Sequence, residues 1–165
     1  MFKFFQKDTP QEDLPAFQDA DIVSPVDGVM IPIEAVKDPV FSQKMMGDGV
    51  AFEIDGDKVK VAAVANGTLS VMYPTGHAFG ITTAEGMEIL IHIGIDTVNA
   101  KGDGFSAAKK QDEAVKAGET IVTVDVKKLK KTYDMTTMLV ITEANGKEIH
   151  FKESGPVKRA QIINQ

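Results

Sequence analysis

The chain has 165 residues, 43% of them hydrophobic, and its 18 lysines and arginines against 24 acidic residues give a net charge of −6. This length predicts a single core, and the negative charge, without a basic run rich in aromatic residues, argues against a nucleic-acid partner. The absence of cysteine excludes disulfides, thiolate metal sites and cysteine nucleophiles. No apolar run is long enough to span a bilayer, so we expect a cytoplasmic protein.

The first 20 residues differ in texture from the rest. Three phenylalanines surround Lys3 within the first five residues, and a polar stretch containing prolines follows. We predict that residues 1–20 form a flexible tail and that residues 21–165 form a single domain. The apolar start of the tail is compatible with weak contact to an anionic membrane surface, or with phenylalanines that dock on the domain.

The remainder of the chain consists of short apolar runs separated by glycine and proline. Asp-Gly or Asn-Gly pairs at residues 27–28, 66–67 and 145–146 favour tight hairpins between the runs that flank them. Helical texture is confined to residues 105–116 and 126–131. We therefore predict an all-β fold, an antiparallel β-sandwich or barrel-sandwich hybrid with one or two short helical turns.

One histidine lies in the middle of a strongly apolar run. Side chains on a strand alternate between its two faces, and one face of this run carries a row suited to the core: Met87, Ile89, Ile91, Ile93 and Ile95. The other face carries His92 between Leu90 and Gly94, with Asp96 beyond them. His92 is therefore expected to face outward from the core.

A second histidine precedes the first by 15 residues. Alternation across residues 75–79 predicts a strand with Thr75, His77 and Phe79 on one face. A hairpin or two adjacent strands can bring His77 and His92 to one place, which predicts a site with two imidazoles. His150 lies in a charged segment and is expected to be solvated.

Two chemistries fit such a site. His77, His92 and Asp96 could bind zinc with one position open for water, as in a zinc-dependent hydrolase, although the His-x-His pair of zinc peptidases with related β architecture is absent. Alternatively, a neutral histidine attacks phosphorus while the second imidazole donates to the phosphoryl oxygens. The ordinary pKa of histidine, about 6.5, leaves the ring substantially neutral at cellular pH. The residues alone leave both chemistries open.

A longer series of motifs carries a family resemblance. The stretches SPVDGVMIPIEAVKDPVFSQKMMGDGVAF, NGTLSVMYPTGHAF, EILIHIGIDTVNAKGDGF and VKAGETIV occur in order between residues 22 and 125. This region resembles the glucose-type enzyme IIA component of the bacterial phosphoenolpyruvate-dependent sugar phosphotransferase system. The resemblance implies a phosphotransferase with a β-sandwich fold and a shallow apolar depression. It also implies a histidine that accepts a phosphoryl group from the carrier HPr and passes it to the IIB domain of a membrane sugar permease.

The resemblance also implies roles for individual residues. His92 matches the phosphorylated histidine, as a tele-phosphohistidine; His77 matches the histidine that stabilises the phosphoryl group; and Thr75 matches the threonine that orients this pair. The partner-binding depression is expected to include Asp38, Val40, Phe41, Met46, Phe79, Leu90, Gly94, Asp96 and Val98. No cofactor is implied, although an adventitious or regulatory zinc ion at the histidine pair is compatible with it.

Several positions depart from the commonest family pattern. Tyr73 and Leu90 stand where phenylalanines are frequent, Met46 stands where valine is frequent, and Gly76 replaces an asparagine before the histidine. These changes keep the rim apolar. We further expect a monomer that visits the inner face of the membrane transiently, and the resemblance leaves open whether it also regulates other proteins.

Overall fold

A computed structural model describes residues 12–165, so the apolar start of the tail lies outside the described residues. The strands are β1 (Gly28–Pro32), β2 (Asp48–Ile54), β3 (Lys58–Ala62), β4 (Gly67–Met72), β5 (Ala78–Thr83), β6 (Glu88–Ile93), β7 (Phe105–Ala107), β8 (Ala114–Val115), β9 (Thr120–Asp125), β10 (Thr137–Glu143) and β11 (Gly155–Val157). The short helices are α1 (Pro39–Ser42) and α2 (Val126–Leu129), with 3-10 turns η2 (Ile33–Ala35) and η3 (Thr97–Ala100).

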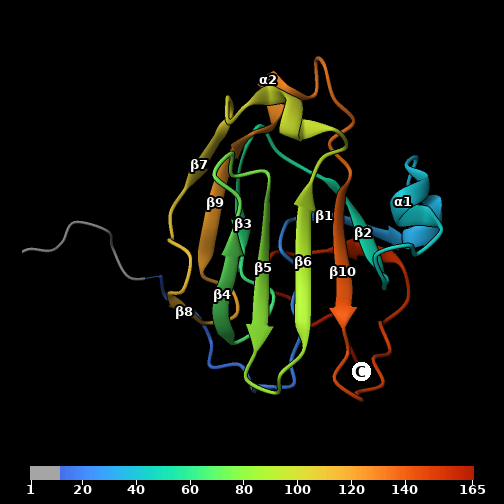
Figure 1. Ribbon diagram of the computed structural model, residues 1–165, viewed down its shortest axis with the longest axis vertical. Coiled ribbons are helices and arrows are strands. Elements are labelled where there is room, and N and C mark those ends of the chain that lie inside the picture. The colour runs from blue at the N-terminus through green and yellow to red at the C-terminus, as the bar shows by residue number, and fades with distance from the viewer. Residues whose placement is uncertain (1–11) are drawn as a thin grey trace, which may run out of the picture.

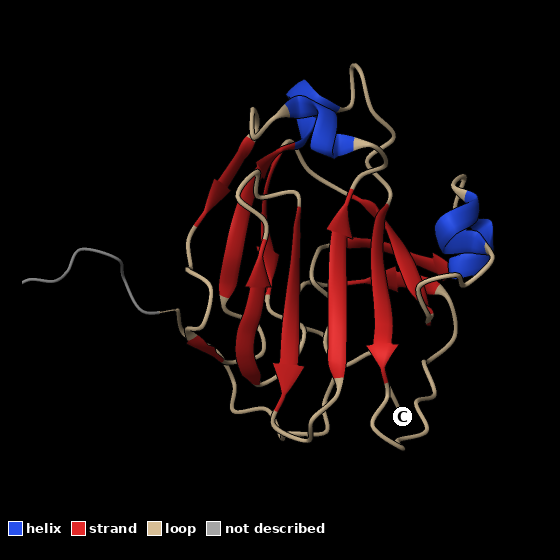
Figure 2. Cartoon of the chain, in the orientation of Figure 1, coloured by secondary structure: helices blue, strands red, loops and turns tan. Residues whose placement is uncertain are grey.

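The strands form two antiparallel sheets. The larger has eight strands in the order β11-β1-β2-β10-β6-β5-β4-β8, and the smaller has the order β3-β9-β7. Strands β10, β6, β5 and β4 run across the front of the molecule, with β3 and β9 behind β4 and β5 (Figures 1 and 2). The predicted all-β class with few short helices is confirmed.

The main core lies between the two sheets. Strand β6 contributes Ile89, Ile91 and Ile93, all at most 1% exposed, and β9 contributes Ile121 and Val122 from the facing sheet. The expected alternation is therefore confirmed within β6, because His92 and Leu90 project from its opposite face and are only half-buried. It is wrong for Ile95, which packs against a smaller apolar cluster on the outer face of the large sheet, because β6 ends at Ile93 and the chain turns at Gly94. This arrangement leaves one side of β6 free to carry a functional site.

A smaller apolar cluster covers the outer face of the large sheet. Phe41 from α1 packs there with Met138 and Val140 of β10 and with Ala51 of β2, and Leu90 packs against the cluster. Asp38 begins α1 by accepting a hydrogen bond from the backbone N–H of Val40. In Figure 1 helix α1 lies at the edge of the molecule beside β2, with β10 between it and β6.

Two local expectations are wrong. Residues 105–116 do not form a helix: they contain β7, which pairs with β9, and β8, which pairs with β4. The three Asp-Gly or Asn-Gly pairs do not close hairpins, because β1 pairs with β2 and β11 and β3 pairs with β9, while β10, before the third pair, bonds to β2 and β6. The predicted helical turn at residues 126–131 is confirmed by α2.

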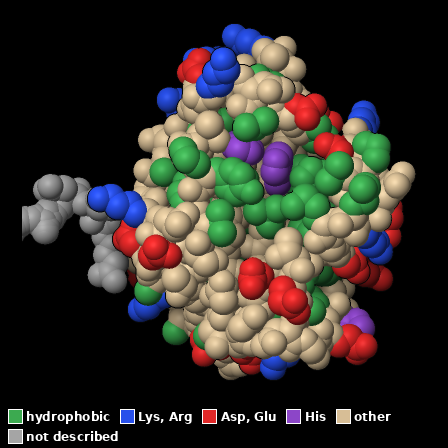
Figure 3. Space-filling view, viewed as in Figure 1, with side chains coloured by type: hydrophobic (Ala, Val, Ile, Leu, Met, Phe, Trp, Pro, Cys, Tyr) green, Lys and Arg blue, Asp and Glu red, His purple; other side chains and the backbone are tan. Residues whose placement is uncertain are grey.

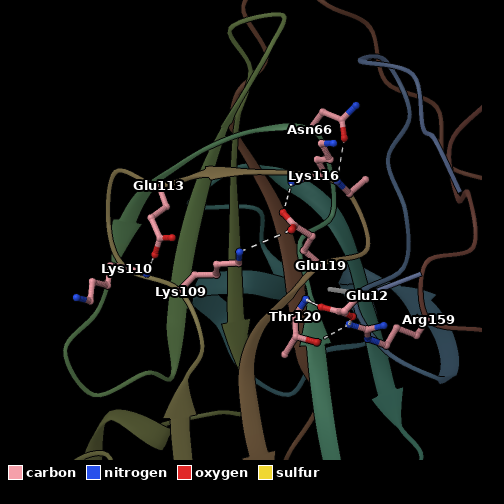
Figure 4. A network of polar contacts seen from close by, with 10 residues as sticks. Glu12, Asn66, Lys109, Lys110, Glu113, Lys116, Glu119, Thr120 and Arg159 are labelled. Carbon is pink, nitrogen blue, oxygen red and sulfur yellow. Dashed lines mark hydrogen bonds and ion pairs between the residues drawn. The ribbon is translucent and has the colours of Figure 1, made fainter. Parts of the chain in front are cut away.

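Residues 12–20 contain no helix or strand, but they are bonded to the domain. Arg159 donates to Glu12 (3.2 Å) and to the Thr120 hydroxyl (2.9 Å), and Glu12 accepts from the Thr120 backbone N–H (Figure 4). The side-chain amide of Asn66 donates to the carbonyl of Phe17. These contacts fasten the segment before β1 to the start of β9, to the residue before β4 and to the segment after β11. Among the described residues, no helix has the length and apolar character needed to cross a membrane.

Candidate functional site

The β5–β6 hairpin brings the two predicted histidines together. Ala78 and His92 are partners in the ladder, and the backbone N–H of Ile93 donates to the carbonyl of His77 (2.7 Å). The imidazole centroids lie 5.2 Å apart with their planes at 80°. The predicted two-imidazole cluster is therefore present in the structure.

One hydrogen bond determines the tautomer of His92. Its Nδ1 atom lies 2.8 Å from the carbonyl oxygen of Gly94. A carbonyl oxygen only accepts, so Nδ1 must carry the hydrogen and donate it. The other ring nitrogen, Nε2, therefore keeps a free lone pair when the ring is neutral, which is the form required of a nucleophile.

His77 is fixed by a different partner. Its side chain is 3% exposed, and its Nδ1 lies 2.6 Å from the Oγ1 of Thr75. The turn at Gly76, whose φ is +76°, separates the two residues. A hydroxyl can donate or accept, so this contact holds the ring in place and is compatible with either tautomer.

The surroundings favour the neutral form of both rings. Burial lowers the pKa of His92, and this effect outweighs the hydrogen bond to Gly94 and the charges of Asp38 and Asp96, which act in the opposite direction. Burial also lowers the pKa of His77, and charge on His92 lowers it further. Both imidazoles are thus expected to be largely neutral near pH 7.

The two rings open into a shallow depression of about 270 Å³. Figure 3 shows histidine side chains at the surface, surrounded by hydrophobic side chains. The depression is lined by Asp38, Val40, Phe41, Met46, Tyr73, His77, Leu90, His92, Asp96 and Val98. The Phe41 ring packs against His92 with centroids 5.1 Å apart. An exposed apolar surface of this kind around polar groups is typical of a protein-binding site.

Two residues expected in the depression lie elsewhere. Gly94 does not line the depression, but its carbonyl accepts the hydrogen bond from Nδ1 of His92. Phe79 is wrongly placed by the sequence, because its side chain is fully buried in the main core and cannot contact a partner. The strand begins at Ala78, so Phe79 pairs with Ile91 and shares the core-facing side of the sheet.

The comparisons with known proteins agree with this geometry. The family model described as phosphoenolpyruvate-dependent sugar phosphotransferase system, EIIA 1, matches residues 20–147. The chain belongs to this EIIA family. It is accordingly a phosphocarrier component of the sugar phosphotransferase system.

Individual relatives support the assignment to the EIIA family. The chain is 39% identical over 143 residues to the PTS system glucose-specific EIIA component of Mycoplasma capricolum, covering 86% of this chain and 92% of the relative. The solved structure of glucose permease IIA from M. capricolum matches with a TM-score of 0.82 and 38% identity, over 87% of this chain and 93% of that one. The glucose-specific EIICBA component of Staphylococcus carnosus is 35% identical over 86% of this chain, which spans 21% of that longer protein.

The zinc-hydrolase alternative does not fit this EIIA domain. Such an enzyme needs three protein ligands around the metal. Among residues 12–165, no three histidine or acidic side chains are grouped so that they could hold a metal ion together. His77, His92 and Asp96 therefore do not form the predicted ligand set, and the comparisons support phosphoryl transfer instead.

Tyr73 contacts His77 directly, whereas the sequence placed it on the apolar rim and gave it no role in the site. It lines the depression, is 42% exposed, and packs edge-on against His77 with ring centroids 5.2 Å apart. Tyr73 begins the turn that carries His77, because its N–H donates to the carbonyl of Ala78. The sequence signal for this contact was a large aromatic residue four positions before a candidate histidine.

Proposed function

We propose that Nε2 of His92 accepts a phosphoryl group from phosphorylated HPr and delivers it to the IIB domain of a sugar permease. The observation that carries this proposal is the 2.8 Å hydrogen bond from Nδ1 of His92 to the Gly94 carbonyl. It keeps the hydrogen on Nδ1 and leaves the lone pair on Nε2. Attack on phosphorus then requires no proton to leave the ring.

The transfer exchanges one bond to phosphorus for another. The bond between phosphorus and the donor group breaks as the bond to Nε2 of His92 forms, and the reverse exchange occurs at the acceptor. His77 assists if Thr75 donates its hydroxyl hydrogen to Nδ1 of His77, because Nε2 of His77 then carries a hydrogen for a phosphoryl oxygen. A fixed donor in a site closed to water stabilises the charge on the group in transit.

The depression suits two successive protein partners. Its apolar rim, which includes Val40, Met46 and Val98, would exclude water when a partner covers His92. Asp38 and Asp96 would attract a basic partner surface and increase the rate of encounter. No cofactor enters this reaction, and a zinc ion bound between the two histidines would compete with it.

The identity of the acceptor is supported by the longer relative. The S. carnosus protein carries a region like this chain within a single EIICBA polypeptide. We infer that the acceptor of this domain is likewise a permease, reached from the cytoplasm at the inner face of the membrane. The relatives are named glucose-specific, so glucose is the first sugar to test.

The test is the intact mass of the protein after incubation with phosphoenolpyruvate, enzyme I and HPr. Wild type is expected to gain one acid-labile phosphoryl group, and His92→Ala is expected to gain none. His150→Ala is the matched control, because His150 is exposed and its ring lies against Glu148, away from the two site histidines. An unmodified wild-type protein beside a working control carrier would overturn the proposal, as would full phosphorylation of His92→Ala.

A further inference from the structure

The peptide group that holds His92 is itself held at its other end. The Gly94–Ile95 peptide accepts the His92 hydrogen bond through its carbonyl and donates its N–H to the carbonyl of Asp134 (2.8 Å). Asp134 in turn closes a tight turn, because its carboxylate accepts from the N–H and hydroxyl of Thr136. The loop before β10 therefore anchors the acceptor of the His92 hydrogen.

The preceding peptide has a separate anchor. The hydroxyl of Thr97 donates to the carbonyl of Ile93, which belongs to the Ile93–Gly94 peptide. Thr97 is 0% exposed, and its methyl group, Cγ2, would lie only 2.5 Å from a Cβ atom placed on Gly94. Thr97 thus contacts the turn at Gly94 with both its hydroxyl and its methyl group.

Together these contacts fix both peptides that flank Gly94. Gly94 has φ +78°, and a glycine is the residue with most freedom to rotate. If either flanking peptide rotates, the Gly94 carbonyl leaves the line of the His92 Nδ1–H bond. A neutral imidazole can then place its hydrogen on Nε2, and a ring in that form cannot attack through Nε2.

We propose that Thr97 is a positioning residue for phosphoryl transfer. Its hydroxyl holds the Ile93–Gly94 peptide so that the Gly94 carbonyl stays directed at Nδ1 of His92 and Nε2 remains the nucleophile. Thr97 does not line the depression, so it acts through the backbone and touches neither partner. The inference rests on the proposed role of His92.

The experiment compares Thr97→Val, which removes the hydroxyl at nearly constant volume, with Thr97→Ser, which keeps it. Nitrogen-15 NMR of the histidine rings above their pKa reports the tautomer without any partner. Wild type and Thr97→Ser are expected to show His92 protonated on Nδ1 alone, and Thr97→Val a mixture of tautomers. Loss of the outer hydrogen bond that orients a metal-bound imidazole typically costs about 10- to 100-fold. By analogy, phosphoryl acceptance by Thr97→Val should slow by about 10- to 100-fold, with little change in KM for HPr.

Thr83→Val is the matched control. Thr83 is 5% exposed and its hydroxyl accepts from the N–H of Met87 at the opposite end of the same hairpin, so its loss should lower stability without altering the His92 tautomer. Thr97→Ala replaces the valine variant if that protein does not fold. A pure Nδ1–H tautomer with normal acceptance in the hydroxyl-free variant, or failure of serine to restore both, would overturn the inference. Failure of the proposed function would appear separately, as a wild-type protein that accepts no phosphoryl group.

Discussion

Ala78 and His92 face each other across the β5–β6 ladder, and this register sets His77 beside His92. A shift of one residue between the strands would turn every side chain of one strand to the opposite face. His92 would then enter the core between the sheets. The spacing of the two imidazoles is therefore a property of strand pairing, enforced by the isoleucines on the core side of β6.

Removal of the second imidazole should separate the two halves of the transfer. His77→Ala is expected to accept a phosphoryl group from HPr, because the nucleophile and its Gly94 partner are intact. Transfer to IIB should fall by about 100-fold, the usual cost of one transition-state donor. Single-turnover measurements of each step check this, and a His77→Ala protein with normal delivery to IIB would contradict the division of roles.

Gly94 and Gly146 provide a matched pair for the turn behind His92. Both have positive φ, +78° and +76°, but a Cβ on Gly94 would meet Thr97 and Met135, whereas a Cβ on Gly146 meets nothing within 4 Å. Gly146→Ala should cost only the left-handed backbone strain, about 1–2 kcal/mol. Gly94→Ala adds overpacking worth roughly 1–3 kcal/mol and should also lose phosphoryl acceptance.

Urea unfolding and the mass assay measure the two effects of these alanines. Equal losses of stability in the two variants, with phosphoryl acceptance retained in Gly94→Ala, would show that the turn tolerates a side chain.

The histidine pair should make folding stability depend on pH. Burial lowers the pKa of His77 and of His92 in the folded protein, so the unfolded chain binds protons at a higher pH than the folded one. Stability therefore rises with pH through the window below about 6.5 and falls as the pH drops through it. Urea unfolding at several pH values should show this slope, and His77→Gln should flatten it. An unchanged slope would mean that His77 is not held neutral.

Variants at Met46 and Met45 distinguish an effect on partner docking from a general effect of added surface charge. Met46 is 40% exposed and lines the depression, while its neighbour Met45 is 69% exposed and does not. Met46→Glu should raise KM for a partner by about tenfold, equivalent to about 1.4 kcal/mol of lost contact, with an unchanged melting temperature. Met45→Glu should leave KM within about twofold. Equal effects of the two variants would place the partner elsewhere.

Strand β6 shows what local pattern could establish. The period-two alternation of residues 87–93 predicted which side of the strand is buried, because one face lies on the core and the other does not. The alternation fails at Ile95, which lies beyond the turn at Gly94 and packs against the smaller apolar cluster on the outer face of the sheet. The family motifs then predicted most of the depression. Neither the hydrogen bond from His92 to Gly94 nor the contact of Thr97 with Ile93 follows from alternation, since both depend on the turn after the strand.

The wrong predictions of a helix and of hairpins arise where pairing between strands that are distant in the sequence overrides the local conformational preference. Residues 105–116 are rich in helix formers, but β7 is held by β9, and Asp112 has φ +77°, which ends any helix there. Asn145 and Gly146 do adopt positive φ, 51° and 76°, yet β10 finds its partners in β2 and β6. A turn dipeptide specifies a local bend, whereas the partner of each strand is decided by the whole sheet.

Phe79 was misplaced for a more local reason. The alternation was read from Thr75, but Gly76 turns the chain and the strand starts only at Ala78. His77 therefore precedes the strand, and its relation to Phe79 is not that of two residues on one face. The hydrophobicity of Phe79 alone could not distinguish a core position from a docking position.

The ion pair between Glu12 and Arg159 joins segments 147 residues apart. Neither residue lines the depression, and in Figure 1 the C-terminus lies at the end of the sheet opposite the tip of β6. A peptide linker attached at Gln165 would leave the histidines uncovered. Joining the domain to its acceptor in this way would replace collisions in solution by an effective concentration in the millimolar range, without a change to any residue that handles the phosphoryl group.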